Sequence, residues 1–245
     1  MKHLKLFENF TLNDLEQQYR EVQYLYKLGI IDKTGLKSAK DQLKLERYIS
    51  DGSKGDLDLT RTGIQSLGGL TQVDGTLWLE HSAIQDLGLL RAIAGALDLR
   101  GTRIQSLGEL REVGGMVDLQ GTPIQSLGEL MEVGSHLLLQ RSAIQDLGKL
   151  REVRGLLDLR KTQIQSLGAL TRVGGYLDLS RTQIQSLGEL REVGGSLQLD
   201  KTPIKSLGEL TQVGRDLDLT RTPISKTHTE DQIRAQVQVG GKVYL

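Results

Sequence analysis

The chain of 245 residues contains 31 Lys and Arg and 31 Asp and Glu, so its formal net charge at pH 7 is zero. A balanced charge gives no indication of a nucleic acid or an anionic membrane as partner. The absence of cysteine excludes a disulfide framework and a thiolate zinc site. The opening residues are too interrupted by charge for a secretory signal, and no apolar run is long enough to span a membrane. We therefore expect a soluble protein of the cytoplasm, or of a virion if a phage encodes it.

The first segment of the chain predicts two helices. The first helix covers residues 11–28, with Thr11 as its N-cap, Asp14 in its first turn and apolar residues at three- and four-residue steps. The second covers roughly residues 34–49. We interpret residues 1–54 as a helical-hairpin cap, because an open solenoid end exposes apolar surface and unpaired strand groups. The alternative is that the hairpin docks another molecule.

Residues 55–224 consist of near-copies of one unit that follow one another every 20 residues. The unit opens with an apolar, polar, apolar triplet such as Leu57-Asp58-Leu59, which is typical of a short strand with one buried face. A fixed period of this length predicts a solenoid of stacked coils. The first apolar residue of each triplet marks the period: Leu57, Leu77, Leu97, Val117, Leu137, Leu157, Leu177, Leu197 and Leu217.

The second half of each unit predicts a short helical turn. Ser106 followed by Glu109 has the spacing of a capping box, and Leu107, Leu110 and Val113 would share one helical face. A small hydroxyl residue earlier in each unit, such as Thr62, is expected to bond the backbone of the adjacent coil. The Gly at position 68 and its equivalents indicates either a contact too close for a Cβ atom or a positive φ.

The repeat resembles a known family. The residues Leu177-x-Leu179-x-x-Thr182-x-Ile184 resemble the L-x-L-x-x-N-x-L core of leucine-rich repeats, of which 20 residues is the short type. The resemblance implies an α/β repeat solenoid: a right-handed coil with one short parallel strand and one short helical turn per repeat. Thr or Ser replaces the ladder Asn, and Gly174 stands where the family has Leu, so a straighter stack than a horseshoe is an open alternative.

The end of the chain departs from the period. Residues 239–245 align with residues 193–199 and predict a tenth strand, while Thr229 and Gln232 have capping-box spacing and open a helix that reaches Val237. We interpret residues 225–245 as a C-terminal cap. The two ends of the chain also resemble uncharacterised proteins of tailed bacteriophages and marine bacteria.

No catalytic, cofactor-binding or metal-binding set is predicted. The four histidines lie in different segments without a paired spacing, and no phosphate-binding loop is present. We therefore expect a protein that is not an enzyme and has no cofactor.

A row of aspartates would stand on the outer face of the strands, between the two leucines of each triplet. Aspartates on neighbouring strands, about 4.8 Å apart, would repel by roughly 1 kcal/mol in a watery dielectric. Ion pairs with Arg100 and Arg160, which lie two residues further on, would offset this repulsion. Bound Ca²⁺ is the alternative, because stacked carboxylates are hard oxygen ligands.

Several apolar residues interrupt this charged face and predict a partner site. The alternative is a scatter of surface apolar residues in a duplicated array. The candidate partner-binding residues are Trp78, Met116, His136, Leu138, Leu156, Tyr176, Asp118, Asp158 and Asp178. The leading hypothesis is a non-enzymatic scaffold that binds a protein through the strand face, which is concave in leucine-rich repeats. A structural component of a phage particle or assembly is the second, and an ice- or Ca²⁺-binding solenoid is the third.

Overall fold

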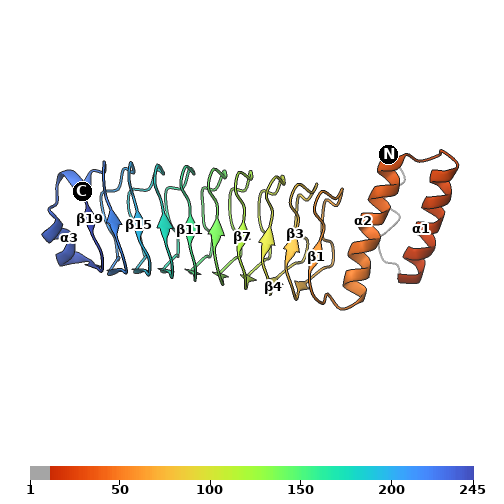
Figure 1. Cartoon of the computed structure of the whole chain (residues 1–245), viewed down its shortest axis with the longest axis horizontal. Coiled ribbons are helices and arrows are strands. Elements are labelled where there is room, and N and C mark those ends of the chain that lie inside the picture. The colour runs from red at the N-terminus through yellow and green to blue at the C-terminus, as the bar shows by residue number, and fades with distance from the viewer. Residues whose placement is uncertain (1–11) are drawn as a thin grey trace.

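The computed structural model describes residues 12–245 and shows a stack of coils with helices at both ends (Figure 1). Helices α1 (Leu12–Lys27) and α2 (Lys33–Ser50) precede the coils, and the 3₁₀ helix η1 (Ile224–Lys226) and helix α3 (Glu230–Gln236) follow them. The protein is therefore a β-solenoid. The coils lie in a nearly straight row rather than a horseshoe, so the strand face is not concave. The predicted Thr11 N-cap lies outside the described residues.

Each coil contributes strands to two parallel sheets. In both sheets every strand pairs in register with its equivalent in the next coil, for example Leu57 with Leu77 and Val113 with Val133. Within residues 12–245 sheet A has ten strands: β1 (Leu57–Asp58), β3 (Leu77–Trp78), β5 (Leu97–Asp98), β7 (Val117–Asp118), β9 (Leu137–Leu138), β11 (Leu157–Asp158), β13 (Leu177–Asp178), β15 (Leu197–Gln198), β17 (Leu217–Asp218) and β19 (Val243–Tyr244). In the same part of the chain sheet B has nine strands: β2 (Gln72–Val73), β4 (Ala92–Ile93), β6 (Glu112–Val113), β8 (Glu132–Val133), β10 (Glu152–Val153), β12 (Arg172–Val173), β14 (Glu192–Val193), β16 (Gln212–Val213) and β18 (Gln238–Val239).

The prediction of a helical turn in each repeat is wrong. From residue 51 to residue 223 no residue is helical, and the segment predicted as a turn ends in a strand of sheet B. The Ser106 hydroxyl accepts a hydrogen bond from the Gly108 amide, two residues on, at 3.1 Å instead of capping a helix. Gly108 has a φ of 59°, which a right-handed helix cannot contain. The equivalent glycines all have positive φ, and a Cβ on Gly148 would also lie 2.5 Å from the Gly128 carbonyl oxygen.

The small hydroxyl residues at position 62 and its equivalents form a column along the stack, which we call the hydroxyl column. The sequence predicts that their hydroxyls bond the neighbouring coil, but the threonine hydroxyls bond the backbone of their own coil. The Thr162 hydroxyl is buried and donates to the carbonyl of Leu159 at 2.7 Å, and the other threonines of the column repeat this bond to the residue three positions before. The serines of the column differ. The Oγ atoms of Ser82 and Ser142 are buried and have no hydrogen-bond partner within the described chain.

Replacing Ser142 by threonine should therefore raise the free energy of unfolding by about 0.5–1.5 kcal/mol. The second substituent on Cβ restricts χ1, and the threonines of the column all hold the hydroxyl on the carbonyl of the residue three before, here Leu139. Urea unfolding would measure the change. The matched substitution Thr162→Ser should lower stability, and a neutral or destabilising Ser142→Thr would contradict the assigned role of the column.

The core is one continuous apolar column between the two sheets. Both leucines of each triplet, the following Ile, two further leucines and the valine of sheet B are buried in the middle coils, many of them with no exposed surface. The valine, predicted to face the core from a helix, does so from a strand. Each coil thus buries its side chains against the coils on both sides, and none can form a core alone.

Helix α2 caps the first coil, as predicted. Leu45 of α2 joins the core. The Lys44 ammonium donates to the Asp58 carbonyl and the Lys37 ammonium to the Arg61 carbonyl at 2.6 Å. The Asp41 carboxylate accepts from the Gly63 amide at 3.0 Å. Polar groups that would be left exposed on the first strand edge are therefore bonded to the cap, and a charged cap of this kind opposes edge-to-edge association.

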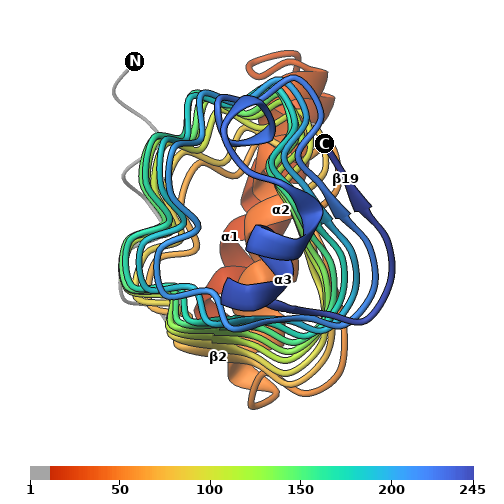
Figure 2. The same ribbon diagram turned by 90° about the vertical axis from the view of Figure 1, so that its left-hand side faces the viewer.

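Helix α3 closes the opposite end of the core, and the view along the stack shows it across the opening of the last coil (Figure 2). The capping box of Thr229 and Gln232 and the final strand β19 are present as predicted. Ile233 of α3 is buried in the core. None of the helices in the described part of the chain is long and apolar enough to cross a membrane.

Candidate binding surface on sheet A

The aspartates of sheet A close the turns that follow the strands. Asp118 accepts a hydrogen bond from the amide of Gln120 at 3.1 Å, and Asp178 accepts from the amide of Ser180 at 2.9 Å. Such side-chain bonds to the backbone two residues on stabilise a turn. The same bond is made by Asp58, Asp98, Asp158 and Asp218. The sequence analysis missed this role, although an Asp two residues before each turn is a signal for it.

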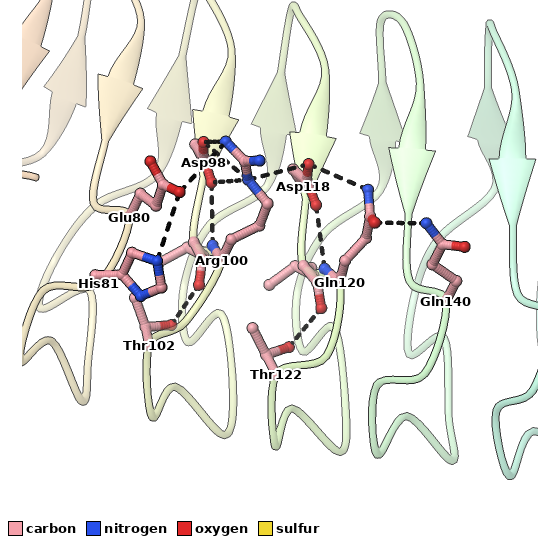
Figure 3. Close-up of polar contacts among 11 residues, drawn as sticks. Glu80, His81, Asp98, Arg100, Thr102, Asp118, Gln120, Thr122 and Gln140 are labelled. Carbon is pink, nitrogen blue, oxygen red and sulfur yellow. Dashed lines mark hydrogen bonds and ion pairs between the residues drawn. The ribbon is translucent and has the colours of Figure 1, made fainter.

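Three of the aspartates are much less accessible than expected. Asp118, Asp158 and Asp178 are each only 5% exposed, although they belong to the outer face of the sheet and not to the leucine core. Figure 3 shows Asp118 between the side chains of Arg100 and Gln120, which cover it. Desolvation raises the pKa of Asp118 and of Asp158 above the ordinary value of 3.8.

Two arginines bridge these aspartates in pairs, as the ion-pair interpretation predicted. The Arg100 guanidinium lies 2.6 Å from Asp98 and 3.4 Å from Asp118. The hydrogen bond to Asp98 raises the pKa of Arg100. Arg160 lies 2.9 Å from Asp158 and 3.9 Å from Asp178. Among the described residues no group of three His, Asp or Glu side chains is placed to hold a metal ion, and Ca²⁺ binding stays an untested alternative.

Two glutamines join the arginine pairs into one polar row. Gln120 donates to Asp118 at 3.3 Å and accepts from Gln140, and Arg160 donates to Gln140 at 2.9 Å (Figure 3 shows the first half of the row). At its far end the Tyr176 hydroxyl donates to Asp178 at 3.2 Å. Burial raises the pKa of Tyr176, so the hydroxyl keeps its proton at physiological pH. The bonds from Gln140 to Gln120 and from Arg160 to Gln140 cross between coils and hold the side chains of the surface in place.

The apolar candidate residues lie beside this row on successive coils. Leu138 stands on sheet A between Asp118 and Asp158. Met116, Leu138, Leu156 and Tyr176 are partly buried, whereas His136 is exposed and accepts the Leu156 amide at 2.9 Å on Nδ1. We call Met116, Leu138, Leu156 and Tyr176 the apolar patch. Trp78 is 36% exposed and pairs with Asp58 and Asp98, so the structure keeps it apart from the patch.

A polar groove of about 670 Å³ runs along the carboxyl ends of the sheet A strands. Arg141, Lys161 and Arg181 line it from three successive coils. All three have positive φ, between 59° and 61°, a conformation that costs a non-glycine residue roughly 1–2 kcal/mol. Their charges, about 4.8 Å apart at the backbone, also repel by up to about 1 kcal/mol per neighbouring pair.

Neither protein-family models nor curated proteins gave a match to this chain. The fold and the surface define a β-solenoid with 20-residue coils, two parallel sheets and helical caps.

Proposed function

We propose that this β-solenoid is a non-enzymatic scaffold that binds a partner protein through the outer face of sheet A. The observation that supports the proposal is the apolar patch beside a hydrogen-bonded polar row. Partly exposed Leu, Met and Tyr side chains next to satisfied polar groups are typical of protein interfaces. Because the row is already held by cross-coil bonds, a partner would meet a surface whose side chains have little entropy left to lose.

The proposal includes a relation to short leucine-rich repeats and a location in the cytoplasm or a virion. The Leu-x-Leu triplet followed by a buried hydroxyl and a buried Ile supports the relation, because these residues fill the same order of core and turn positions in every coil. Sheet B is the main departure from that family's pattern of one strand and one helical turn.

The proposal can be tested with a surface variant that spares the core. Purified protein carrying Leu138→Ala and Tyr176→Ala should lose proteins that the wild type enriches at micromolar concentration from an extract of the source cells, measured by quantitative mass spectrometry. Leu89→Ala is the matched control, since Leu89 is 48% exposed in the segment leading to sheet B. An unchanged set of enriched proteins in the double variant, or none enriched by the wild type, would overturn the proposal.

A structural component of a phage particle or assembly is the second candidate function. The resemblance of the chain ends to tailed-phage proteins supports it, and mass spectrometry of purified particles would test it. Ice binding has less support, because the threonines that form the hydroxyl ladder are buried and donate to their own coil.

A further inference from the structure

One corner of every coil holds a residue in the left-handed backbone conformation, with φ between 55° and 68°. Two coils have glycine at this position, Gly101 and Gly121. Glycine adopts a positive φ without strain, so these two coils avoid the strain that other residues have there. The next five coils have a basic residue instead. This basic row consists of Arg141, Lys161, Arg181, Lys201 and Arg221.

The charge of the basic row is largely uncompensated. All five side chains are exposed, and Arg221 lies 3.4 Å from Asp200. Within residues 12–245 none of the other four has an ion-pair partner within 4.0 Å. Arg160, one residue before the row, is by contrast held between two aspartates. Backbone strain and repulsion between like charges therefore fall on the same residues. The backbone amides of the first four bond to the next coil, for example Lys161 to the Ser180 carbonyl at 3.2 Å, but among the described residues only Arg221 of the row has an ion pair that offsets the repulsion. Unfavourable features that recur at one place in this way indicate a functional site.

The groove beside the row has the chemistry of a peptide site. Gln140 and Ser180 line it together with the cations and supply hydrogen-bonding groups for a peptide backbone. As far as the structure describes the chain, the groove lining contains no aromatic residue on which a base could stack, which disfavours a nucleic acid. The row covers about 19 Å over five coils, which corresponds to about six residues of extended chain.

We propose that this groove binds an extended acidic segment of the partner protein, with carboxylates facing the basic row. The inference deepens the proposed function, since it assigns a chemistry to the partner. The groove and the apolar patch lie over the same coils: Tyr176 of the patch bonds Asp178 of the groove. A partner that covers the patch would therefore place a neighbouring acidic segment within reach of the row.

The test uses a fluorescent hexapeptide of alternating Glu and Ser and its Gln-substituted counterpart, with anisotropy measured at low and physiological salt. The wild type should bind the Glu peptide at least tenfold more tightly than the Gln peptide, and salt should weaken binding. Lys161→Gln with Arg181→Gln should reduce binding about tenfold or more. Gln keeps the backbone strain of the site, so the variant changes the charge alone.

Arg111→Gln with Arg151→Gln is the matched control, because both arginines are exposed on the sheet B side and the loss of charge is equal. This control should bind the Glu peptide within twofold of the wild type. Equal binding of the groove variant and the control, or tighter binding of a thymidine hexanucleotide than of the Glu peptide, would overturn the inference. The inference would also be overturned if the wild type self-associates in sedimentation experiments and the groove variant does not.

The two proposals can fail separately. If the peptide does not bind but partner capture depends on Leu138 and Tyr176, the acidic-segment proposal is wrong and the scaffold proposal stands. Peptide binding that requires Lys161 and Arg181, without any captured partner, would leave the groove as an anion site and remove the scaffold proposal.

Discussion

Replacing Leu137 by alanine should lower the free energy of unfolding by about 2–5 kcal/mol, whereas Leu138→Ala should cost about 1 kcal/mol or less. The two residues are neighbours on β9, but Leu137 has no exposed surface and Leu138 is partly exposed on the outer face. Leu137 packs against coils on both sides, so its truncation leaves a cavity that those coils cannot fill without breaking their register.

Urea unfolding followed by circular dichroism would measure both variants. In a solenoid, stability is close to a sum of coil and nearest-neighbour contributions, so Leu137→Ala should also separate the unfolding of the two halves of the stack. If Leu138→Ala lowers the free energy of unfolding as much as Leu137→Ala does, Leu138 is a core residue and its assignment to the apolar patch is wrong.

Replacing Arg160 by glutamine should lower the free energy of unfolding by about 1–3 kcal/mol at pH 7. The substitution leaves Asp158 and Asp178, each 5% exposed, on neighbouring strands without their shared cation. Arg111→Gln is the control: Arg111 is exposed outside the basic row and no ion pair holds it in the described chain, so its replacement should change stability by about 0.5 kcal/mol or less.

The pH dependence of the Arg160→Gln deficit has a definite sign. Burial already raises the folded-state pKa of Asp158 above 3.8, and loss of the Arg160 charge would raise it further. A carboxyl whose pKa is raised on folding stabilises the fold below its unfolded pKa and loses that contribution as pH rises through the folded pKa. The deficit should therefore shrink between pH 7 and pH 4, and adding Asp178→Asn should recover part of it. A deficit that is constant with pH would mean that Arg160 acts through packing alone.

The parts of the fold that could be predicted are those encoded within one repeat or one helix. The triplet Leu157-Asp158-Leu159 places its leucines in the core through the two-residue alternation of a strand, and Thr229 with Gln232 caps α3 over a three-residue spacing. These signals depend on neighbours in the sequence, so reading them needs no knowledge of the other coils.

The helical turn could not be rejected in the same way. Leu107, Leu110 and Val113 have the spacing of a helical face, and they do face the core. Their backbone is irregular because Gly108 has a positive φ and because Glu112 and Val113 pair with residues 20 positions away on both sides. The inter-coil hydrogen bonds of sheet B exist only in the stack, and they outweigh a weak local helix preference in a short segment.

For the candidate surface, the outward direction of the aspartates, the bridging arginines and the interruption by Leu138 were all readable from the columns. The burial of Asp118, Asp158 and Asp178 was not, since it depends on which rotamer Arg100 and Arg160 adopt toward the next coil. The basic row likewise became notable only when the backbone at Arg141 and its equivalents proved to be left-handed.

The amino-acid sequence by itself determined the period, the residues that fill the core, the two helical ends and the face on which charged and apolar side chains meet. The tertiary structure alone decided that each coil has a second strand, that the aspartates at 118, 158 and 178 are covered and that three cations without an ion pair in the described chain line a groove. The reason is that periodicity fixes which way a side chain points, whereas burial, ion pairing and strand pairing are set by coils that lie one full turn away in the chain.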